Sequence, residues 1–443
     1  MSKITEKLNV ICKASLTLEL LCLAIYLIFC IIFYQERTLF LDNAYQTFLL
    51  IQDREIVVNA NRWPVVVLRV LPLMVVKLGG SIKLVLMTFS LSYTLFQLAI
   101  YFIIRVLNMD KYRSWMLLAL MVLPVAHSFY WCNSELITGL SLVVLLVSCI
   151  EGERHIYSVI LLLILPWVHP LILVLVGFVL AYYFLFHSDY RFRSFFFGVL
   201  YIGMTLIKSV FFQNWYDTDK NRILARQIRE YAFADHNLDY IFQSAFWPII
   251  LFVFICIALC FYFLRYWVLL YYVTTSCAYL LLQDIMIRNY DNVFYHEVSY
   301  LLLFLWSVFV IHKIGVILPA KTLKVIGFVL FTIGFTRIFL QGSFYSDRVD
   351  WYQDILQDQD RKVITYDKSD YPQLVMEWGS PYESLLISSM DGPSKTIIFA
   401  ENPSDFITDD PVFVSHFGMI PLDELDQEYF DLKYKSYMID GNN

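Results

Sequence analysis

The chain has 443 residues, of which 59% are apolar and only 16% are charged, and its mean hydropathy is +0.61. A soluble protein of this length needs more charge to cover its surface, and apolar runs of about 20 residues recur along this sequence. The composition therefore excludes a soluble globular protein and predicts a polytopic, all-α membrane protein. The eight cysteines lie within apolar runs or, like Cys12, at the start of one, and none forms a CxxC pair, so we interpret them as core residues.

The net charge of −6 is unevenly distributed. Residues 343–443 contain 20 acidic and 7 basic residues, a net charge of −13, so the first 342 residues carry +7. This asymmetry predicts two parts, a membrane domain over 1–342 and a soluble acidic domain over 343–443, with the boundary at Gln341-Gly342-Ser343. We call residues 343–443 the acidic tail.

The apolar runs predict about eleven spans. The first follows a basic N-terminus and is too long for a signal-peptide core, so we interpret it as an uncleaved span. Lys/Arg clusters separate alternate pairs of runs and, if all are cytoplasmic, place the N-terminus inside and the tail outside. The runs cover 11–34, 82–104, 115–132, 135–150, 155–168, 171–186, 194–213, 247–264, 267–283, 294–312 and 323–340.

One further apolar segment, 63–80, would bring the count to twelve. It contains Arg69, Pro72 and Lys77, and counting it as a span would move the cluster around Arg105 to the outer side. Basic residues spaced along an apolar background are typical of a helix lying in the membrane interface. Residues 35–81 are therefore predicted to form one outer loop with two interfacial helices, around 43–53 and 63–79.

Two carboxylates fall at short outer segments. Asp42 lies just past the first span, and Glu135 lies at the turn between the third and fourth. A pair of carboxylates at one membrane face can serve as a general base and as a metal ligand or acceptor-positioning group. Each also has a simpler explanation, because both stand where a helix begins: Asp42 as an N-cap and Glu135 in a capping position.

Cationic and polar residues gather on the same predicted face. Arginine forks suit phosphate, which points to a lipid-phosphate-linked substrate. Two longer outer segments, 214–246 and 284–297, are predicted as polar loops, whose charges can instead pair with one another in solvent. His169-Pro170 is predicted to mark a break between two spans, with a functional histidine as the alternative. The candidate binding residues are Arg62, Arg69, His169, Arg288, Asp291, His296, Glu297 and Arg337.

In this layout the chain resembles the GT-C class of integral-membrane glycosyltransferases, which use polyprenyl-phosphate sugars at the outer face. The resemblance covers roughly residues 1–200. It is carried by Leu41-Asp42-Asn43-Ala44-Tyr45 in the first outer loop, the paired interfacial helices, Ser134-Glu135-Leu136 after the third span, and the outer C-terminal domain. Many members of the class have a second acidic residue where this chain has Asn43. Nothing in the tail matches a WWD-like triad, Glu377-Trp378-Gly379 being the nearest segment.

The resemblance implies an inverting transfer. Asp42 would deprotonate or orient an acceptor hydroxyl, which attacks the anomeric carbon, while Arg288, with Arg69 or Arg337, would stabilise the departing polyprenyl phosphate. The implied partners are a polyprenyl-phosphate-linked sugar, a lipid, glycan or protein acceptor, and the bilayer, but not nucleic acid. No cofactor is called for with certainty, and a divalent metal stays open. A bacterial inner membrane is the expected location.

Two other functions compete with this interpretation. A polysaccharide polymerase would place its main catalytic loop late in the chain, at 214–246. A transporter or flippase would show paired repeats and ionisable groups at the bilayer midplane, whereas here Glu19 and Lys208 are the exceptions among span interiors with few charges. In the tail, a helix at 348–357 and strands at 362–366, 396–400 and 412–414 predict a small α/β or α+β domain.

Overall fold

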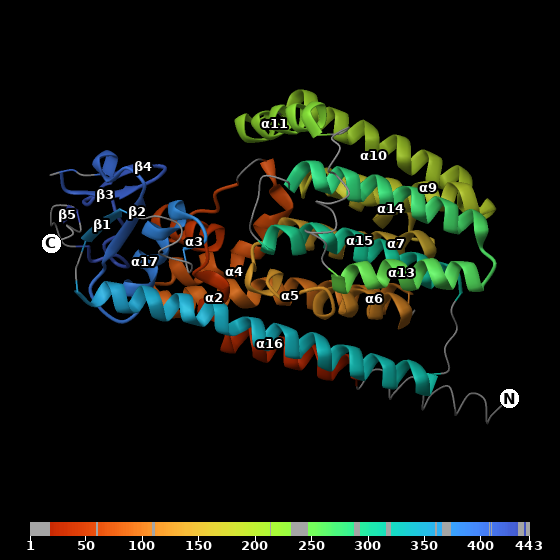
Figure 1. The fold of residues 1–443 in the computed structure, drawn as a ribbon, viewed down its shortest axis with the longest axis horizontal. Helices are drawn as coiled ribbons and strands as arrows, with labels where there is room; N and C mark the ends of the chain where they lie inside the picture. The colour runs from red at the N-terminus through yellow and green to blue at the C-terminus, as the bar shows by residue number, and fades with distance from the viewer. Residues whose placement is uncertain are drawn as a thin grey trace.

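The computed structural model describes residues 18–58, 61–108, 111–212, 214–231, 247–287, 293–315, 320–358, 361–365, 374–406, 408, 410–432 and 438–439. A long helical bundle carries a small domain of mixed helix and strand at one end (Figure 1). The helices of the bundle are Leu18–Ile32, α5 (Ile82–Asn108), α6 (Lys111–Val122), α7 (Glu135–Glu151), α8 (His155–Ile164), α9 (Ile172–Phe186), α10 (Arg191–Phe211), α13 (Trp247–Tyr262), α14 (Tyr266–Ile287), α15 (Val293–Lys313) and α16 (Ala320–Asp358).

Each predicted apolar run overlaps one of these helices, which confirms the helical character of the part predicted to lie in the membrane. Within the described ranges, four helical segments are long and apolar enough to cross a membrane: Ile82–Val106, Ser188–Phe211, Tyr266–Met286 and Lys324–Gln357. The count of eleven spans stays a prediction. Helix α10 leaves much of its apolar surface uncovered, with Phe192 81% and Phe211 75% exposed, as expected for a helix that faces lipid.

Helix α7 lies at the centre of the bundle and connects two polar ends. Its residues from Leu136 to Ile150 are all buried, and its 17 residues extend about 25 Å. At its last residue, Glu151 binds Arg113 of α6, Lys313 of α15 and the hydroxyl of Tyr183. Two basic residues predicted to be cytoplasmic therefore meet at one end of α7, and Glu135 begins the other end.

The predicted run 115–132 is wrong in its second half. Helix α6 ends at Val122, and an irregular segment with a 3-10 turn at Ser128–Tyr130 follows. The irregular backbone is stabilised by Glu297 of α15, whose carboxylate accepts the backbone N–H groups of Ala126 (2.7 Å) and Ser128 (2.8 Å). A buried carboxylate thus satisfies donors that a continued helix would have satisfied itself.

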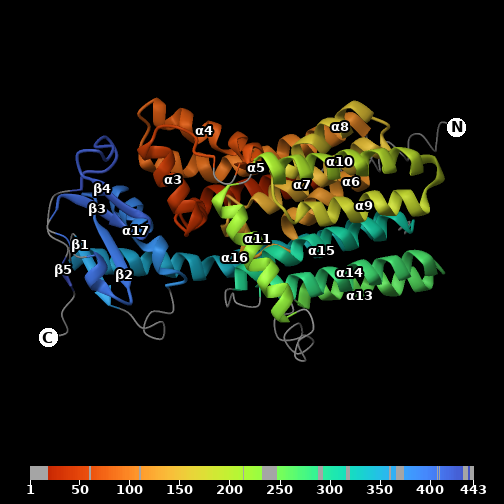
Figure 2. The same cartoon turned by 90° about the horizontal axis from the view of Figure 1, so that it is seen from above.

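The two helices predicted in the first outer loop are present. They are α3 (Asp42–Gln52) and α4 (Val66–Lys77), the latter preceded by a 3-10 turn, Trp63–Val65, with proline in its first turn. A short helix, α2 (Tyr34–Thr38), links the first long helix to α3. Helices α3 and α4 lie between the bundle and the tail domain (Figure 2). Their position in the membrane interface stays a prediction.

Both late outer segments differ from the loops that were predicted. Trp215–Tyr231 forms a helix, α11, because Ile223, Leu224, Gln227 and Ile228 recur at helical spacing within a polar sequence. It lies at the end of α10 nearest the tail (Figure 1). Over 284–297, α14 continues to Ile287 and α15 begins at Val293, so most of the segment is helical.

The acidic tail is not separated from the bundle at Gly342. Helix α16 runs through that position without a break, from Ala320 to Asp358. Its 39 residues extend about 58 Å, whereas the hydrocarbon core of a bilayer is about 30 Å thick, so the helix is about twice as long as a bilayer crossing requires. The change in composition at 343 falls within the helix and does not mark the end of an element.

The tail folds as a small α/β unit, and the three predicted strands are confirmed. β1 (Arg361–Thr365) pairs in parallel with β2 (Thr396–Ala400) and with β5 (Met438–Ile439) in the order β2-β1-β5. β3 (Val412–Ser415) and β4 (Gly418–Pro421) form an antiparallel hairpin. Serine hydroxyls of α17 (Ser380–Ser389) accept the N–H groups of Ile397 (2.9 Å) and Phe399 (3.3 Å) on the edge strand β2.

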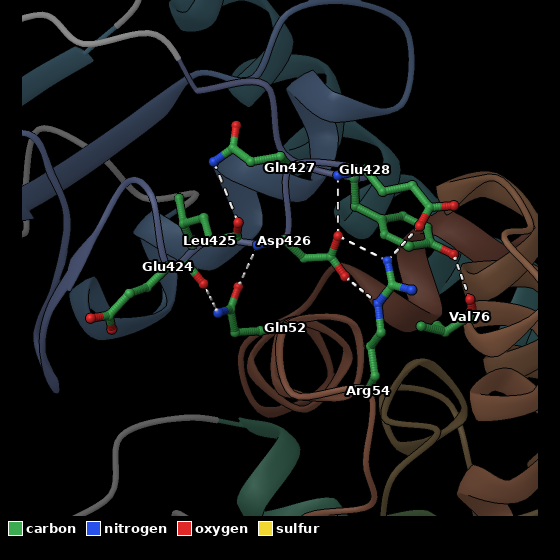
Figure 3. A network of polar contacts seen from close by, with 9 residues as sticks. Gln52, Arg54, Val76, Glu424, Leu425, Asp426, Gln427 and Glu428 are labelled. Atoms are coloured by element: carbon green, nitrogen blue, oxygen red, sulfur yellow. Dashed lines mark hydrogen bonds and ion pairs between the residues drawn. The ribbon is translucent and has the colours of Figure 1, made fainter.

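The tail docks on α3 and α4 through side chains that follow or end these helices (Figure 3). Gln52 donates to the Glu424 carbonyl (2.7 Å) and accepts the Asp426 N–H (3.0 Å). Arg54 forms a two-pronged ion pair with Asp426 (2.6 and 3.0 Å), and Tyr429 donates to the Val76 carbonyl at the end of α4 (3.1 Å). The first outer loop and the tail therefore form one packed unit.

Candidate functional site

Asp42 is the first residue of α3, so the N-cap interpretation is wrong. The N-cap is Leu41, and no side chain caps the helix. Leu41 has φ 42° and ψ −115°, a strained conformation for a residue with a branched side chain. Its N–H is held by Glu383 of α17 at 2.7 Å. A tail carboxylate thus fixes the backbone turn that immediately precedes Asp42.

The side chain of Asp42 is half-buried and faces two cations from different elements. Burial raises the pKa of Asp42 to about 6, although Arg62 and Lys220 each lower it. Arg62 comes from the segment before α4, and Lys220 from α11. A carboxyl with a pKa near neutrality and positive charges beside it matches the properties of a general base.

Glu135 pairs with Arg62. The two side chains form an ion pair, both largely buried. Ser134 is the N-cap of α7, and its side chain accepts the Ile137 N–H. Glu135 therefore does not cap the helix, and its carboxylate pairs with Arg62. Arg62 therefore lies between the two candidate carboxylates, and the structure brings all three predicted residues together.

His169 joins the same cluster from the connection between α8 and α9. Burial, followed by the charges of Arg62 and Lys208, lowers the pKa of His169 to about 3, so the ring is neutral at physiological pH. Its Nδ1 accepts the Leu171 N–H at 3.2 Å, which leaves the proton on Nε2. Lys208 of α10 donates to the Pro166 carbonyl at 3.1 Å.

Arg69 lies beside this cluster, on α4. It is 2% exposed, and its guanidinium donates to the Val57 carbonyl and to Asn133 Oδ1 (3.4 Å). Burial lowers the pKa of Arg69 to about 10, a value at which the side chain is still charged at neutral pH. Through Asn133 this cation is connected to the loop that leads into Glu135.

Asn43, which stands where the GT-C class often has a second acid, has a structural role. Its Nδ2 donates to the carbonyls of Arg37 (2.6 Å) and Tyr130 (3.3 Å), and its Oδ1 accepts the Asn133 N–H (3.1 Å). The side chain is completely buried. Only an amide can donate and accept in this way, so the geometry requires asparagine here.

Asn43→Asp is accordingly expected to destabilise the protein by about 2 kcal/mol or more, because two buried carbonyls would then face a carboxylate instead of a donor. Thermal unfolding of the purified full chain in detergent measures this loss. Asn61→Asp is the matched control, since Asn61 donates to one carbonyl, that of Phe212, in a solvent-accessible place. Equal melting temperatures for the two variants would contradict the assignment.

Glu297 and Arg337 belong to a second cluster, and His296 directly precedes Glu297 on α15. Glu297 has the four protein donors of the irregular segment, including the Ser128 hydroxyl at 2.6 Å, and is fully buried. Arg337 of α16 donates to the Leu123 carbonyl at 2.8 Å, at the start of the same segment. These contacts give both residues a structural role in holding the segment that positions Glu135.

Two predicted binding residues, Arg288 and Asp291, lie outside the described residues. For the part of the chain that the structure does describe, no group of three or more His, Cys, Asp or Glu side chains is arranged to hold a metal ion.

The sequence alone does not identify three contributors. Lys220 falls within the predicted loop 214–246, Lys208 is a charge within a predicted span, and Glu383 is one acid among many in the tail. The helical spacing of apolar residues in 215–231 could have predicted α11, and the rarity of charge inside spans flags Lys208. The sequence has no signal for the contact between Glu383 and Leu41.

Comparison of the chain with protein-family models, with curated proteins and with solved structures gave no match.

Proposed function

We propose that this protein is an integral-membrane glycosyltransferase that moves a sugar from a polyprenyl-phosphate donor to an acceptor hydroxyl at the outer membrane face, with the N-terminus cytoplasmic and the tail outside. One observation carries the proposal: Asp42, with its pKa raised to about 6, lies near Arg62 at one end of the bundle, and the same arginine pairs with Glu135 and lies near neutral His169. The bacterial inner membrane is the proposed location.

Each residue of the site has a separate role in the proposed transfer. Asp42, deprotonated, accepts the proton of the acceptor hydroxyl as its oxygen bonds to the anomeric carbon, and the bond from that carbon to the phosphate oxygen breaks on the opposite face. The configuration is inverted. Lys220 and Arg62 supply positive charge for the departing polyprenyl phosphate, and Glu135 orients Arg62. Arg288, predicted for this role, remains a candidate.

Transfer of labelled sugar tests the proposal directly. The full chain, reconstituted in lipid, is incubated with radiolabelled polyprenyl-phosphate sugars and a membrane extract as the acceptor source. We expect label to enter the acceptor and polyprenyl phosphate to be released in equal amount. Labelled product that forms only from a nucleotide-linked sugar would contradict the proposal. So would a transfer rate that does not depend on the polyprenyl-phosphate donor.

The pH dependence of transfer should follow Asp42. Since the base must be ionised, the rate is expected to fall as the pH drops through about 6, approaching tenfold per unit below it. Lys220→Met removes a cation that lowers the pKa of Asp42, so the midpoint should move to higher pH. Arg229→Met, an exposed change on the same helix, serves as the control and should leave the profile where it is. An unshifted midpoint for Lys220→Met would argue against Asp42 as the titrating group.

One observation favours the alternative function, a polysaccharide polymerase. Helix α11, within the segment 214–246 that a polymerase would use, brings Lys220 to the candidate base. A polymerase would add sugars repeatedly to one growing chain, whereas a simple transferase would add one. The length distribution of labelled products separates the two.

A further inference from the structure

Three aromatic rings from separate parts of the chain meet at the junction of α3 and the tail. They are Tyr45 on α3, Trp378 in the 3-10 turn Glu377–Gly379, and Phe417 in the turn between β3 and β4. The ring centroids lie 5.2 Å apart for Tyr45 and Phe417, 5.5 Å for Trp378 and Phe417, and 6.4 Å for Tyr45 and Trp378. We call these three residues the aromatic shelf.

Tyr45 and Trp378 are half-buried, and Phe417 at the edge of the shelf is exposed on a turn that hydrogen bonds hold. Phe417 is 61% exposed, so most of this large apolar ring does not contribute to the core. Its turn is fixed by Ser415, whose hydroxyl donates to the Gly418 carbonyl (3.0 Å) and accepts the Phe417 N–H (3.2 Å). Gly418 has φ 137°, a conformation that suits glycine. An exposed ring held in this way is preorganised for a ligand.

The shelf adjoins the candidate base. Tyr45 is three residues after Asp42 on α3, a spacing that puts both on one helix face. Burial raises the pKa of the Tyr45 hydroxyl, and the nearby charges of Asp53 and Asp42 raise it further. A molecule lying on the three rings would therefore have one edge beside Asp42.

The charges around the aromatic shelf indicate which class of ligand it binds. The tail carries a net charge of −13, which repels anionic lipid headgroups and nucleic acids. Glu377, which directly precedes Trp378 and lies near His416, provides a carboxylate acceptor beside the rings. A neutral sugar ring has apolar C–H faces that stack on aromatic rings and hydroxyl edges that donate to carboxylates, so it fits both features.

We propose that the aromatic shelf binds a sugar ring of a neutral glycan acceptor and presents its hydroxyl to Asp42. This inference rests on the proposed function and specifies its acceptor as a glycan. It predicts that Phe417→Ala and Trp378→Ala raise the KM for a glycan acceptor about tenfold and leave kcat within about threefold, since a lost stacking contact of that size is about 1.4 kcal/mol.

The test measures binding apart from catalysis. The full chain in detergent, without donor, is titrated calorimetrically with chitohexaose, maltohexaose and mannohexaose, together with Phe417→Ala, Trp378→Ala and Asp42→Asn. Phe192→Ala, which removes an exposed ring from α10, is the matched control. We expect saturable binding of at least one hexasaccharide, with the Kd raised at least tenfold by the two shelf variants and unchanged in the control and in Asp42→Asn.

Either of two results would overturn the shelf: no saturable binding of any hexasaccharide, or equal affinity in wild type and shelf variants. Binding of zwitterionic lipid vesicles that is lost in the shelf variants, without glycan binding, would assign the shelf to the membrane instead. Failure of the proposed function is recognised separately. Glycan binding that depends on the shelf, with no sugar transfer from any polyprenyl-phosphate donor, would leave the shelf in place and refute the transferase.

Discussion

Asp42→Asn is expected to lower the rate of sugar transfer by about 10²- to 10⁴-fold, the usual contribution of a general base, without unfolding the protein. The substitution keeps the size of the side chain but removes its ability to accept a proton. Acceptor KM should change little, because the amide still fills the same space. Transfer from a radiolabelled polyprenyl-phosphate donor in lipid measures the loss, and a rate at the wild-type level would refute the assignment.

The same variant should be at least as stable as the wild type at neutral pH. Burial raises the pKa of Asp42 from 3.8 to about 6 even with Arg62 and Lys220 nearby, so the ionised carboxylate disfavours the folded state. That cost is absent below about pH 4 and complete above about pH 6. Asp42→Asn should therefore melt at or above the wild-type temperature at pH 7.5, and the two proteins should converge near pH 4.

Asp53→Asn is the matched control for both measurements. It makes the same chemical change at the C-terminal end of α3, where the side chain is exposed. Transfer should stay within about twofold of wild type. If Asp53→Asn loses as much activity as Asp42→Asn, the effect belongs to the helix or to its charge, and not to the residue at its first position.

The elements of this protein could be predicted because their signals are local. Apolar runs of span length, the basic and proline-containing sequence around Arg69, and the alternating strands of the tail each depend on neighbouring residues. Helix α11 is the exception, because its polar composition is typical of a loop, although Ile223, Leu224 and Ile228 recur at helical spacing.

The candidate site was predictable only in part, for a different reason. Asp42 and Glu135 are predicted because carboxylates on short segments at one predicted membrane face can act as a base and its partner, and Arg62 because arginine suits phosphate. Which of them meet is decided by the irregular segment after α6, which Glu297 and Asn43 hold by hydrogen bonds over long sequence separations. Partners 87 and 171 residues apart leave no periodic trace in a single sequence.

The buried pair of Glu383 and Arg348 is expected to have the largest effect on stability. Both side chains are almost completely buried, at 0% and 2% exposure, and they form an ion pair between α17 and α16. Glu383→Gln leaves the guanidinium without its counter-charge, which costs about 3–5 kcal/mol for a buried pair. The amide oxygen can still accept the Leu41 N–H, so this variant isolates the loss of charge.

A double variant separates charge from backbone support. Glu383→Gln combined with Arg348→Met removes both charges, and we expect it to recover more than half of the stability lost by Glu383→Gln alone. Glu383→Ala combined with Arg348→Met also removes the acceptor for Leu41, whose strained turn then has no buried partner at its N–H. This second double variant should recover less of the lost stability than the first. It should also transfer sugar more slowly, because Asp42 directly follows Leu41.

Thermal unfolding and transfer rates of these variants in lipid decide the matter, with Glu424→Gln, an exposed change in the same tail, as the control. If all these variants have the melting temperature of the wild type, the buried pair does not stabilise the packing of the tail on α16. If the two double variants are equally active, Glu383 does not position Asp42 through Leu41. A lower rate confined to the variants that lack an oxygen at position 383 would instead connect the folding of the tail to the geometry of the base.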